Sequence, residues 1–403
     1  MIDKRRAAVR TTGDEDGMVT QSITGVTWGH RRAIEPLQAA TVEFMGKHPD
    51  ISVNWRIRTL QDFEHQPLEV AMRGVDVLIL DHPMVGAIAE SGLFVPVDDV
   101  LAGVPGGTDP KSYIGPSLES YRWRDRFWAV PVDGATVNAI FRPDVLDVAD
   151  LPVSWKDALD LGRALRRSGR WLGMAAGDHH ALMTLQCLMA NLGAPWPTQP
   201  GAAFVFDERV LSEAIGLVRQ AVELAPPEAL GWNSIALHDA MIARGDVVYC
   251  PATYGYATYG EADQTARLCF GPFAGAAVPY CAGTALGGAG AGMSARSEHP
   301  EAVRALLRFL ASADVQHTIF ATHRGQPARI EAWEDSACDA IFNGYFSSVA
   351  ETMTRAWIRP RFNGYNPFER EAGRLFRAHL LGEISEASFI AQLRAIAPAT
   401  VTA

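Results

Sequence analysis

Apolar and polar residues follow two different periods along this chain, and the two periods take turns. Between residues 51 and 57 every second residue is apolar, which is typical of a half-buried strand. Residues 34–47 instead place apolar side chains three and four positions apart, as on one face of a helix. The helical spacing recurs at residues 155–167, 182–191, 208–224, 235–244 and 300–311. This alternation predicts an α/β fold.

The strand expected at residues 75–80 is apolar apart from Asp76, and it leads into Asp81, His82 and Pro83. Such a run is typical of a parallel strand covered by helices on both faces, and Pro83 cannot continue it. A short helix is expected next. Because ligands of open α/β sheets bind at the carboxyl edge of the strands, the pattern places a carboxylate and an imidazole at a binding edge.

A second apolar strand is expected from residue 127, ending at Asp133 and Gly134, with a third strand that contains Asn138 beginning almost at once. We interpret this stretch as a place where the chain crosses between two lobes. A plain turn at Asp133-Gly134 is the alternative, because this dipeptide is common in turns.

The order of these segments resembles the extracellular solute-binding protein family 1, the sugar-type substrate-binding proteins of ABC importers. The resemblance covers roughly residues 20–380 and rests on short stretches at 23–30, 74–99, 127–143, 240–256, 286–294 and 297–333. It implies an α/β, two-lobed type II periplasmic-binding-protein fold with a ligand cleft between the lobes. Lobe 1 is expected to comprise residues 21–131 and 284–328. Lobe 2 is expected to comprise residues 132–283 and 329–403 with the C-terminal helices, and residues 1–20 are expected to form a flexible tail.

The same resemblance implies a function without chemistry. A small polar solute, a sugar or sugar derivative, is bound by closure of the two lobes, and the partner is an ABC permease if the protein is exported. The chain is expected to act as a monomer, with no catalytic residue, no metal site and no cofactor.

A sugar cleft needs carboxylates or amides for the hydroxyl groups and aromatic rings for the apolar ring faces. The residues expected to bind the solute stand where strands or helices end, and are Trp28, His30, Asp81, His82, Asp133, Asn138, Trp232, Asn233, Tyr254, Tyr256, Gly288 and Arg361. Of these, the family pattern most directly implies Trp28, Asp81, Asp133, Trp232 and Tyr254. The interpretation predicts that Asp133→Ala abolishes solute binding and leaves folding intact.

Several of these residues have a structural alternative. Trp28 either faces the cleft or caps the core of lobe 1, and Asp81 either binds solute or caps the helix that follows Pro83. The structural alternative for His82 is a turn residue, and the alternative for Trp232 is packing at the start of a helix. Residues 357–361 resemble a segment that reaches back to the cleft, where an arginine orients a carboxylate or hydroxyl pair or else forms a structural ion pair.

Charge and composition narrow the class of partner. The net charge of −10 argues against nucleic acid, which needs clustered basic residues. The five cysteines follow neither a CxxC pattern nor a Cys/His metal spacing, and their odd number leaves at least one thiol unpaired. We expect most of them to be small buried side chains, a usage that leans towards a reducing compartment.

The start of the chain leaves its location open. Four basic residues fall within residues 1–21, but the ~7 to 15 apolar residues of a signal peptide do not follow them. The family is periplasmic or on the cell surface, so an export signal was either removed or never present. The second hypothesis is therefore a cytosolic enzyme or sensor on the same fold, for which thiaminase I is a precedent. In it, Asp81, His82, Asp133 or a cysteine in the cleft would act on a small polar metabolite.

Overall fold

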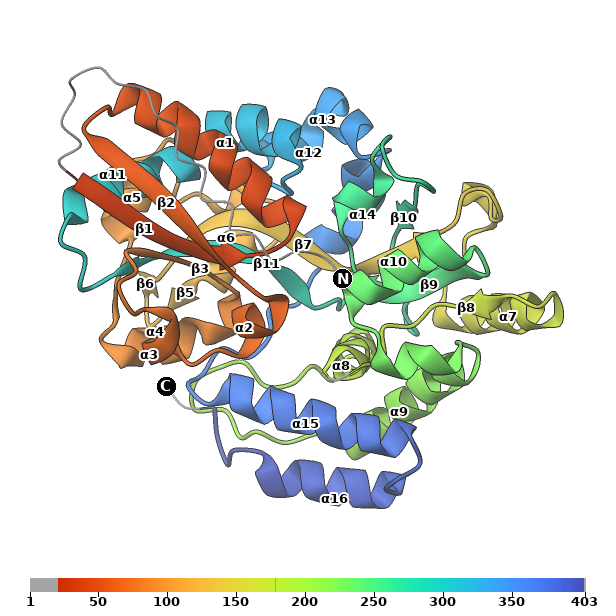
Figure 1. Ribbon diagram of the computed structural model, residues 1–403. Helices are drawn as coiled ribbons and strands as arrows, with labels where there is room; N and C mark the ends of the chain where they lie inside the picture. Colours follow the sequence, from red (N-terminus) through yellow and green to blue (C-terminus); the bar gives the residue numbers. More distant parts are fainter. Residues whose placement is uncertain (1–20, 178, 402–403) are drawn as a thin grey trace, which may run out of the picture.

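One mixed sheet runs through the whole molecule and joins its two halves (Figure 1). The computed structural model describes residues 21–177 and 179–401. Within them the sheet has nine strands in the order β2-β1-β3-β11-β7-β9-β8, with β4 paired to β11 and β10 paired to β7. A separate pair of short strands, β5 and β6, is antiparallel. The flexible tail expected at residues 1–20 lies outside the described residues.

The strands are β1 (Gln21–Trp28), β2 (Ile51–Arg58), β3 (Val77–Leu80), β4 (Phe94–Val95), β5 (Arg122–Trp123), β6 (Arg126–Phe127), β7 (Val130–Phe141), β8 (Trp171–Leu172), β9 (Val247–Tyr254), β10 (Cys269–Gly271) and β11 (Leu286–Ser294). The α-helices are α1 (Arg31–Lys47), α2 (Leu60–His65), α3 (Leu68–Ala71), α4 (Val85–Ser91), α5 (Asp98–Ala102), α6 (Ser117–Ser120), α7 (Trp155–Arg167), α8 (His180–Asn191), α9 (Glu208–Glu223), α10 (Ser234–Arg244), α11 (Pro300–Ala311), α12 (Glu331–Glu334), α13 (Ser336–Ile341), α14 (Tyr345–Thr354), α15 (Tyr365–Leu380) and α16 (Glu386–Ile396).

The apolar strand β3 is covered on both faces, as the sequence predicts. Val77 and Ile79 belong to one hydrophobic core, and Leu78 and Leu80 belong to another. All four side chains are at most 1% exposed. The strand begins at residue 77 rather than 75, because the Asp76 carboxylate accepts hydrogen bonds from the Thr24 amide and the Ser297 hydroxyl. It is parallel to β1 and antiparallel to β11.

The expected helices form close to their predicted bounds. Helices α7 and α11 match at both ends, and α1 begins three residues earlier than expected. Helix α7 starts with a capping box, in which Ser154 and Asp157 satisfy each other's backbone amides. His30 caps α1, since its Nδ1 accepts a hydrogen bond from the amide of Arg32. Local signals at helix ends therefore agree with the apolar period here.

Strand β7 corrects the expected division at Asp133-Gly134. Residues 130–141 form one continuous strand, not two strands separated by a turn. Its first part, to Thr136, pairs with β11, and the part from Val137 pairs with β9. Because a partner strand is present on each side of the crossing, the backbone has no reason to turn. The ladder is irregular next to the crossing, between Asn138 and Ile140.

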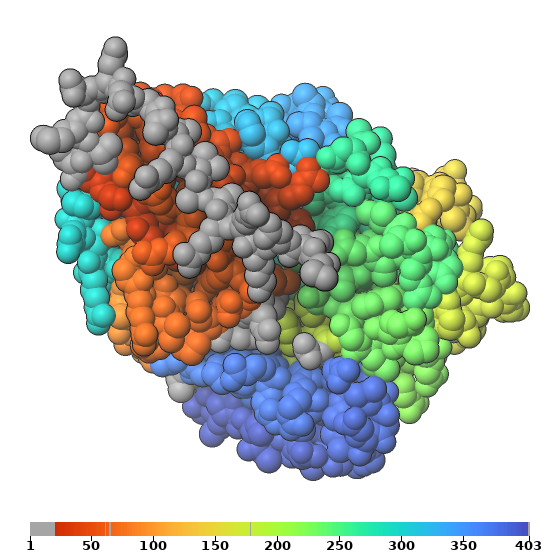
Figure 2. Space-filling model, in the orientation of Figure 1, coloured from red at the N-terminus to blue at the C-terminus, as the bar shows by residue number. Residues whose placement is uncertain are grey.

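The C-terminal segment contacts both halves of the molecule. Helix α15 packs against α8 and also against the short 3₁₀-helix η1 (His82–Met84) that follows β3. Figure 2 shows this segment, in blue, lying against residues coloured orange and residues coloured green. In the described part of the chain, no helix combines the length and the apolar character that a membrane span needs.

The close approach of β11 to β7 gives a test of the crossing. Gly288 has φ of 111°, and a Cβ there would lie 2.2 Å from the Asp133 carbonyl oxygen. We expect Gly288→Ala to lower the unfolding free energy by about 2 kcal/mol or more, because strained backbone positions cost of order 1–3 kcal/mol each. The measurement is urea denaturation of both variants. Gly46→Ala in α1 is the control, since a Cβ at Gly46 has open space. Equal losses of unfolding free energy in Gly288→Ala and Gly46→Ala would contradict the close approach of β11 to β7.

Candidate functional site

Charged side chains from distant parts of the chain meet where β3 ends. Arg359, in the segment before α15, donates to Asp81 Oδ2 at 2.5 Å and to Glu369 Oε2 at 3.4 Å. Arg359 and Glu369 are buried, while 20% of the Asp81 side chain is exposed. Burial alone would raise the pKa of the Asp81 carboxyl, but Arg359 and a hydrogen bond with His82 hold it well below its ordinary value. Asp81 is therefore an ionised group whose charge is already matched.

Polar side chains on α8, β9 and α15 extend this group. The Tyr365 hydroxyl donates to Glu369 Oε1 at 2.7 Å, and Gln186 Nε2 donates to the same hydroxyl at 3.0 Å. Tyr254, at the end of β9, donates to the Leu286 carbonyl oxygen at 3.2 Å. Burial raises the pKa of the Glu369 carboxyl against the effect of Arg359. We call the set the central cluster: Asp81, Gln186, Tyr254, Arg359, Tyr365 and Glu369.

His82 adjoins the central cluster as a neutral packing residue. It is fully buried, and burial lowers its pKa to about 4. Asp81 Oδ1 accepts a hydrogen bond of 2.8 Å from the His82 amide, which caps η1. The capping alternative for Asp81 is thus observed, and the second carboxylate oxygen binds Arg359. One side chain does both because the two oxygens point to different partners.

A second buried pair joins α1 to the crossing strand. Arg32 Nε donates to Asp133 Oδ2 at 2.8 Å, Nη2 donates to Oδ1, and Nη1 donates to the Gly255 carbonyl oxygen at 3.1 Å. Both side chains are buried, and the guanidinium lies 4.9 Å from the centre of the Tyr256 ring. Burial raises the pKa of the Asp133 carboxyl, and the Arg32 charge acts against that rise.

Aromatic and imidazole rings surround this pair. The His30 ring meets the Tyr256 ring edge-on with centroids 4.7 Å apart, and His238 lies 4.6 Å from Tyr259. Burial lowers the pKa of His30 to about 3 and that of His238 to about 4, with nearby Arg32 adding to both shifts. Both rings are therefore neutral near neutral pH.

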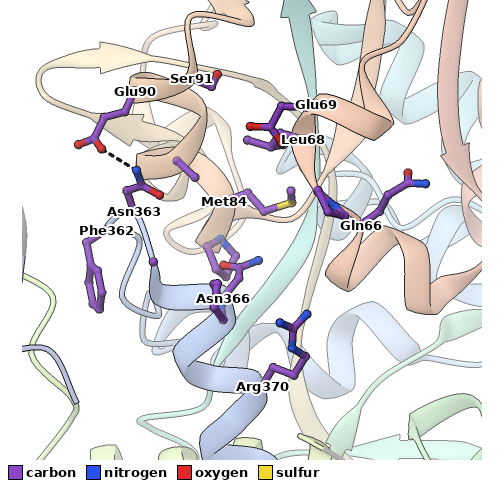
Figure 3. A pocket seen from close by; sticks show the side chains of 15 residues that line it. Gln66, Leu68, Glu69, Met84, Glu90, Ser91, Phe362, Asn363, Asn366 and Arg370 are labelled. Atoms are coloured by element: carbon purple, nitrogen blue, oxygen red, sulfur yellow. Dashed lines mark hydrogen bonds between the residues drawn. The ribbon is translucent and has the colours of Figure 1, made fainter. Parts of the chain in front are cut away.

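A cavity of about 360 Å³ lies beside the central cluster (Figure 3). It opens between η1 and α4 on one side and the start of α15 on the other. Polar side chains alternate with apolar ones around it: Gln66, Glu69, Glu90, Asn363, Asn366 and Arg370, and Leu68, Pro83, Met84 and Phe362. Glu90 Oε2 accepts a hydrogen bond of 2.7 Å from Asn363. The cavity and the central cluster share η1 and the first turns of α15.

The structure gathers most of the residues that the sequence singles out into two groups. Asp81, His82 and Tyr254 lie in or beside the central cluster. Around the Arg32–Asp133 pair lie His30, Asn138 and Tyr256. Asn138 belongs to this group because its Oδ1 lies close to Gly255, where a Cβ would be only 2.2 Å away. Gly288 pairs with Gly134 across β11 and β7, between the two groups. Their role in solute binding stays a prediction.

The other expected residues have structural contacts. Trp28 is 5% exposed and packs 4.7 Å from Phe63 in the core of lobe 1, the packing alternative named above. Asn233 caps α10 through the amide of Ala236, and Trp232 is half-buried just before it. Arg361 Nη1 donates to three backbone carbonyl oxygens, those of Glu119, Ser120 and Arg122.

Several residues of the two groups were missed by sequence reasoning. Arg32 had a signal, because a cation in the first turn of a helix opposes the helix dipole and calls for a compensating partner. Gln186, Tyr365 and Glu369 had none, since they lie inside ordinary helical patterns. The cavity residues lie on α3, α4 and α15, which come together only in the folded chain.

The thiols give no support to a nucleophilic role. Cys187 and Cys250 are fully buried, and burial raises the pKa of each to about 12. Cys187 Sγ accepts a hydrogen bond of 3.1 Å from the Ala285 amide, near the central cluster. A thiol with such a pKa is protonated at neutral pH and is a poor nucleophile.

Two lobes that share one sheet and enclose polar side chains at the carboxyl ends of their strands define a two-lobed ligand-binding protein. The chain belongs to the family of bacterial extracellular solute-binding proteins, whose family model matches residues 29–317. This match confirms the resemblance found in the sequence. No curated protein sequence matches the chain.

Solved structures similar to this chain have the same fold. The maltose-bound MalE3 of T. maritima has a TM-score of 0.79 at 18% identity, covering 93% of this chain and 99% of that one. A substrate-binding protein of Listeria monocytogenes in complex with cycloalternan has a TM-score of 0.76 at 17% identity. The match covers 94% of this chain and 98% of that one. A solute-binding protein of Agrobacterium vitis with bound D-mannitol has a TM-score of 0.73 at 13% identity. The match covers 93% of this chain and 97% of that one. These likenesses confirm the two-lobed fold.

The buried pair changes the expectation for folding of the Asp133 variant. Asp133→Ala leaves the Arg32 charge buried without its partner, which typically costs about 3–5 kcal/mol. We expect its unfolding free energy to fall by that amount in urea denaturation. The double variant Arg32→Met with Asp133→Leu removes both charges and should recover most of the loss. An unchanged stability in Asp133→Ala would contradict this role for the pair.

The buried histidines predict loss of stability in mild acid. The pKa values of His82 and His238 lie near 4 in the folded chain against 6.5 for a free histidine, so the unfolded chain binds more protons as pH falls. The contribution of these two histidines to the unfolding free energy is complete above pH 6.5 and is lost progressively as the pH falls towards 4. At pH 5 the two together should cost about 4 kcal/mol, at 1.36 kcal/mol per pH unit for each group.

The measurement is the unfolding free energy at pH 7 and pH 5. His238→Gln should reduce the difference, whereas His323→Gln, which changes an exposed side chain, should keep it. The same difference in all three proteins would show that the acid sensitivity comes from other groups.

Proposed function

We propose that this protein binds an uncharged sugar or polyol between its two lobes and passes it to an ABC permease. The family supports solute binding. The similar structures, whose ligands include maltose and D-mannitol, support a polyhydroxylated solute. The observation that carries the choice of an uncharged solute is the matching of buried charges inside the protein itself.

The charge argument begins with the central cluster. Asp81 is neutralised by Arg359, and Asp133 is neutralised by Arg32. A cationic solute would find both carboxylates already bound, and an anionic solute would find both guanidinium groups already bound. At these two buried pairs, either charged solute would be desolvated without a free opposite charge, which is costly. A neutral solute does not meet this cost.

The cavity of Figure 3 adds the chemistry that hydroxyl groups need. Asn366 and Gln66 can each donate and accept hydrogen bonds, and Glu69 and Arg370 contribute one charge of each sign. Met84 supplies apolar surface for the face of a sugar ring. The cavity volume lies within the range of about 300–1,000 Å³ that is common for small-molecule sites.

Closure of the lobes is the proposed mechanism. Asp81 and the cavity residues on α3 and α4 fall within the expected lobe 1, whereas Tyr254 and the start of α15 fall within the expected lobe 2. A solute that touches both sets gains all its contacts only in the closed form, so binding shifts the population towards that form. A permease then has a surface to recognise that depends on solute, and a monomer suffices.

The test is a thermal-shift screen with matched ligands. Glucose, mannitol, glucosamine and gluconate present similar hydroxyl groups with neutral, positive and negative charge. We expect neutral ligands to raise the melting temperature, with about 2.7 kcal/mol of stabilisation at 100 times the dissociation constant. Larger neutral sugars extend the series. A response only to charged ligands would overturn the proposed class.

A matched pair of variants connects the response to the site. Asp81→Asn removes the charge and one acceptor beside the cavity, and we expect it to weaken binding of the ligand found by about tenfold, the loss of one hydrogen bond to a charged group. Asp125→Asn changes a carboxylate that is 93% exposed and should bind as the parent does. Equal affinities in the parent and both variants, measured by calorimetry, would remove Asp81 from the site.

A further inference from the structure

Three different metal-ligating side chains meet on the surface away from the proposed solute site. His317, Asp335 and Cys338 each offer one ligand atom, and these atoms all lie within 4.8 Å of one another. His317 Nε2 is 2.6 Å from Asp335 Oδ2, and Cys338 Sγ is 3.6 Å from the same oxygen. The imidazole and the carboxylate are about one-third exposed, whereas the cysteine is buried.

Local backbone geometry produces this arrangement. Asp335 is the N-cap of α13 and Cys338 lies in its first turn, so both face the same side of the helix. Asp335 Oδ1 accepts the capping hydrogen bond from the Ala337 amide, which leaves Oδ2 directed at His317. His317 lies in a π-helical segment, η6 (Val315–Phe320). Such segments are rare in proteins, and those that occur are often found at functional sites.

The three donors are those that zinc prefers. Zinc binds thiolate, imidazole and carboxylate at about 2.3, 2.0 and 2.1 Å, and a tetrahedral arrangement at these lengths separates neighbouring ligand atoms by about 3.4–3.6 Å. The sulfur-to-oxygen distance already has this value. The imidazole needs to move back by about 0.8 Å, from hydrogen-bonding distance to the distance between two ligands of one ion.

We infer that His317, Asp335 and Cys338 form a binding site for a divalent transition metal of the zinc class, with three protein ligands and the remaining position open to water. A soft thiolate beside an imidazole selects zinc or cobalt over calcium or magnesium, which prefer oxygen ligands. Binding displaces the proton of the Cys338 thiol, which goes to solvent, and the metal–sulfur bond replaces the S–H bond.

The bound metal would connect segment η6 to helix α13. Segment η6 packs against α1, α11 and α12, while α13 packs against α12 and α14. The site therefore joins residues on the two sides of residue 328, the expected last residue of lobe 1. Metal binding adds a fixed connection there and should stabilise the folded chain.

The experiment uses the full chain, freed of metal by a chelator and kept reduced. Titration with Zn²⁺ in a calorimeter should give one equivalent bound. Titration with Co²⁺ should produce the near-ultraviolet absorption band of thiolate-to-cobalt charge transfer. Cys338→Ser should remove that band, and Cys338→Ser and His317→Ala should each weaken Zn²⁺ binding by about tenfold or more.

Matched variants separate the site from other thiols and imidazoles. Cys281→Ser and His323→Gln change a partly exposed thiol and an exposed imidazole elsewhere, and should bind Zn²⁺ as the parent does. Asp335→Asn keeps a side chain that caps α13 but removes the ligand charge, so it should fold and bind more weakly. No charge-transfer band in the parent, or a band and an affinity that all three site variants retain, would overturn the proposal.

Discussion

The buried pair of Arg32 and Asp133 connects three segments of the fold that are distant in sequence. It fixes the first turn of α1 to the middle of β7, and its third hydrogen bond reaches the Gly255 carbonyl oxygen after β9. Gln326 strengthens the same place, since its carbonyl oxygen accepts from the Gly134 amide and its side chain accepts from the Ala257 amide. Removing one partner leaves the other charge buried without a counter-charge, so each member of the pair depends on the other.

Charge matching recurs at the central cluster. Arg359 comes from the C-terminal segment and binds carboxylates on η1 and α15, so the same guanidinium holds the segment in place and neutralises the site. The protein thus separates two tasks. Arginine–carboxylate pairs position the backbone, whereas amides, apolar side chains and the charges of Glu69 and Arg370 line the cavity proposed for the solute.

The fold was largely predictable because its signals are local. The period of apolar residues located β3, α7 and α11, and the order of short segments indicated the family. Strand β7 was misread because Asp-Gly is a turn signal in sequence, whereas two partner strands keep it extended in the fold. The candidate site was less predictable, because its members are far apart: Arg359 is 278 residues from Asp81, and Cys338 is 21 residues from His317. Helical patterns also hid Gln186 and Glu369, whose polarity is satisfied only by tertiary partners.

The shared strand β7 also determines how the molecule can be divided. The first part of β7 pairs with β11 and its second part pairs with β9, so the strand cannot be assigned to one lobe alone. A fragment limited to one lobe would expose the edge of a sheet whose neighbour has been removed, and such edges pair with other chains. Fragments made by cutting at a lobe boundary would therefore aggregate, whereas a nick in a surface loop outside β7 would leave two pieces that associate into the intact sheet. The shared strand therefore predicts that the two halves of the sheet fold as one unit.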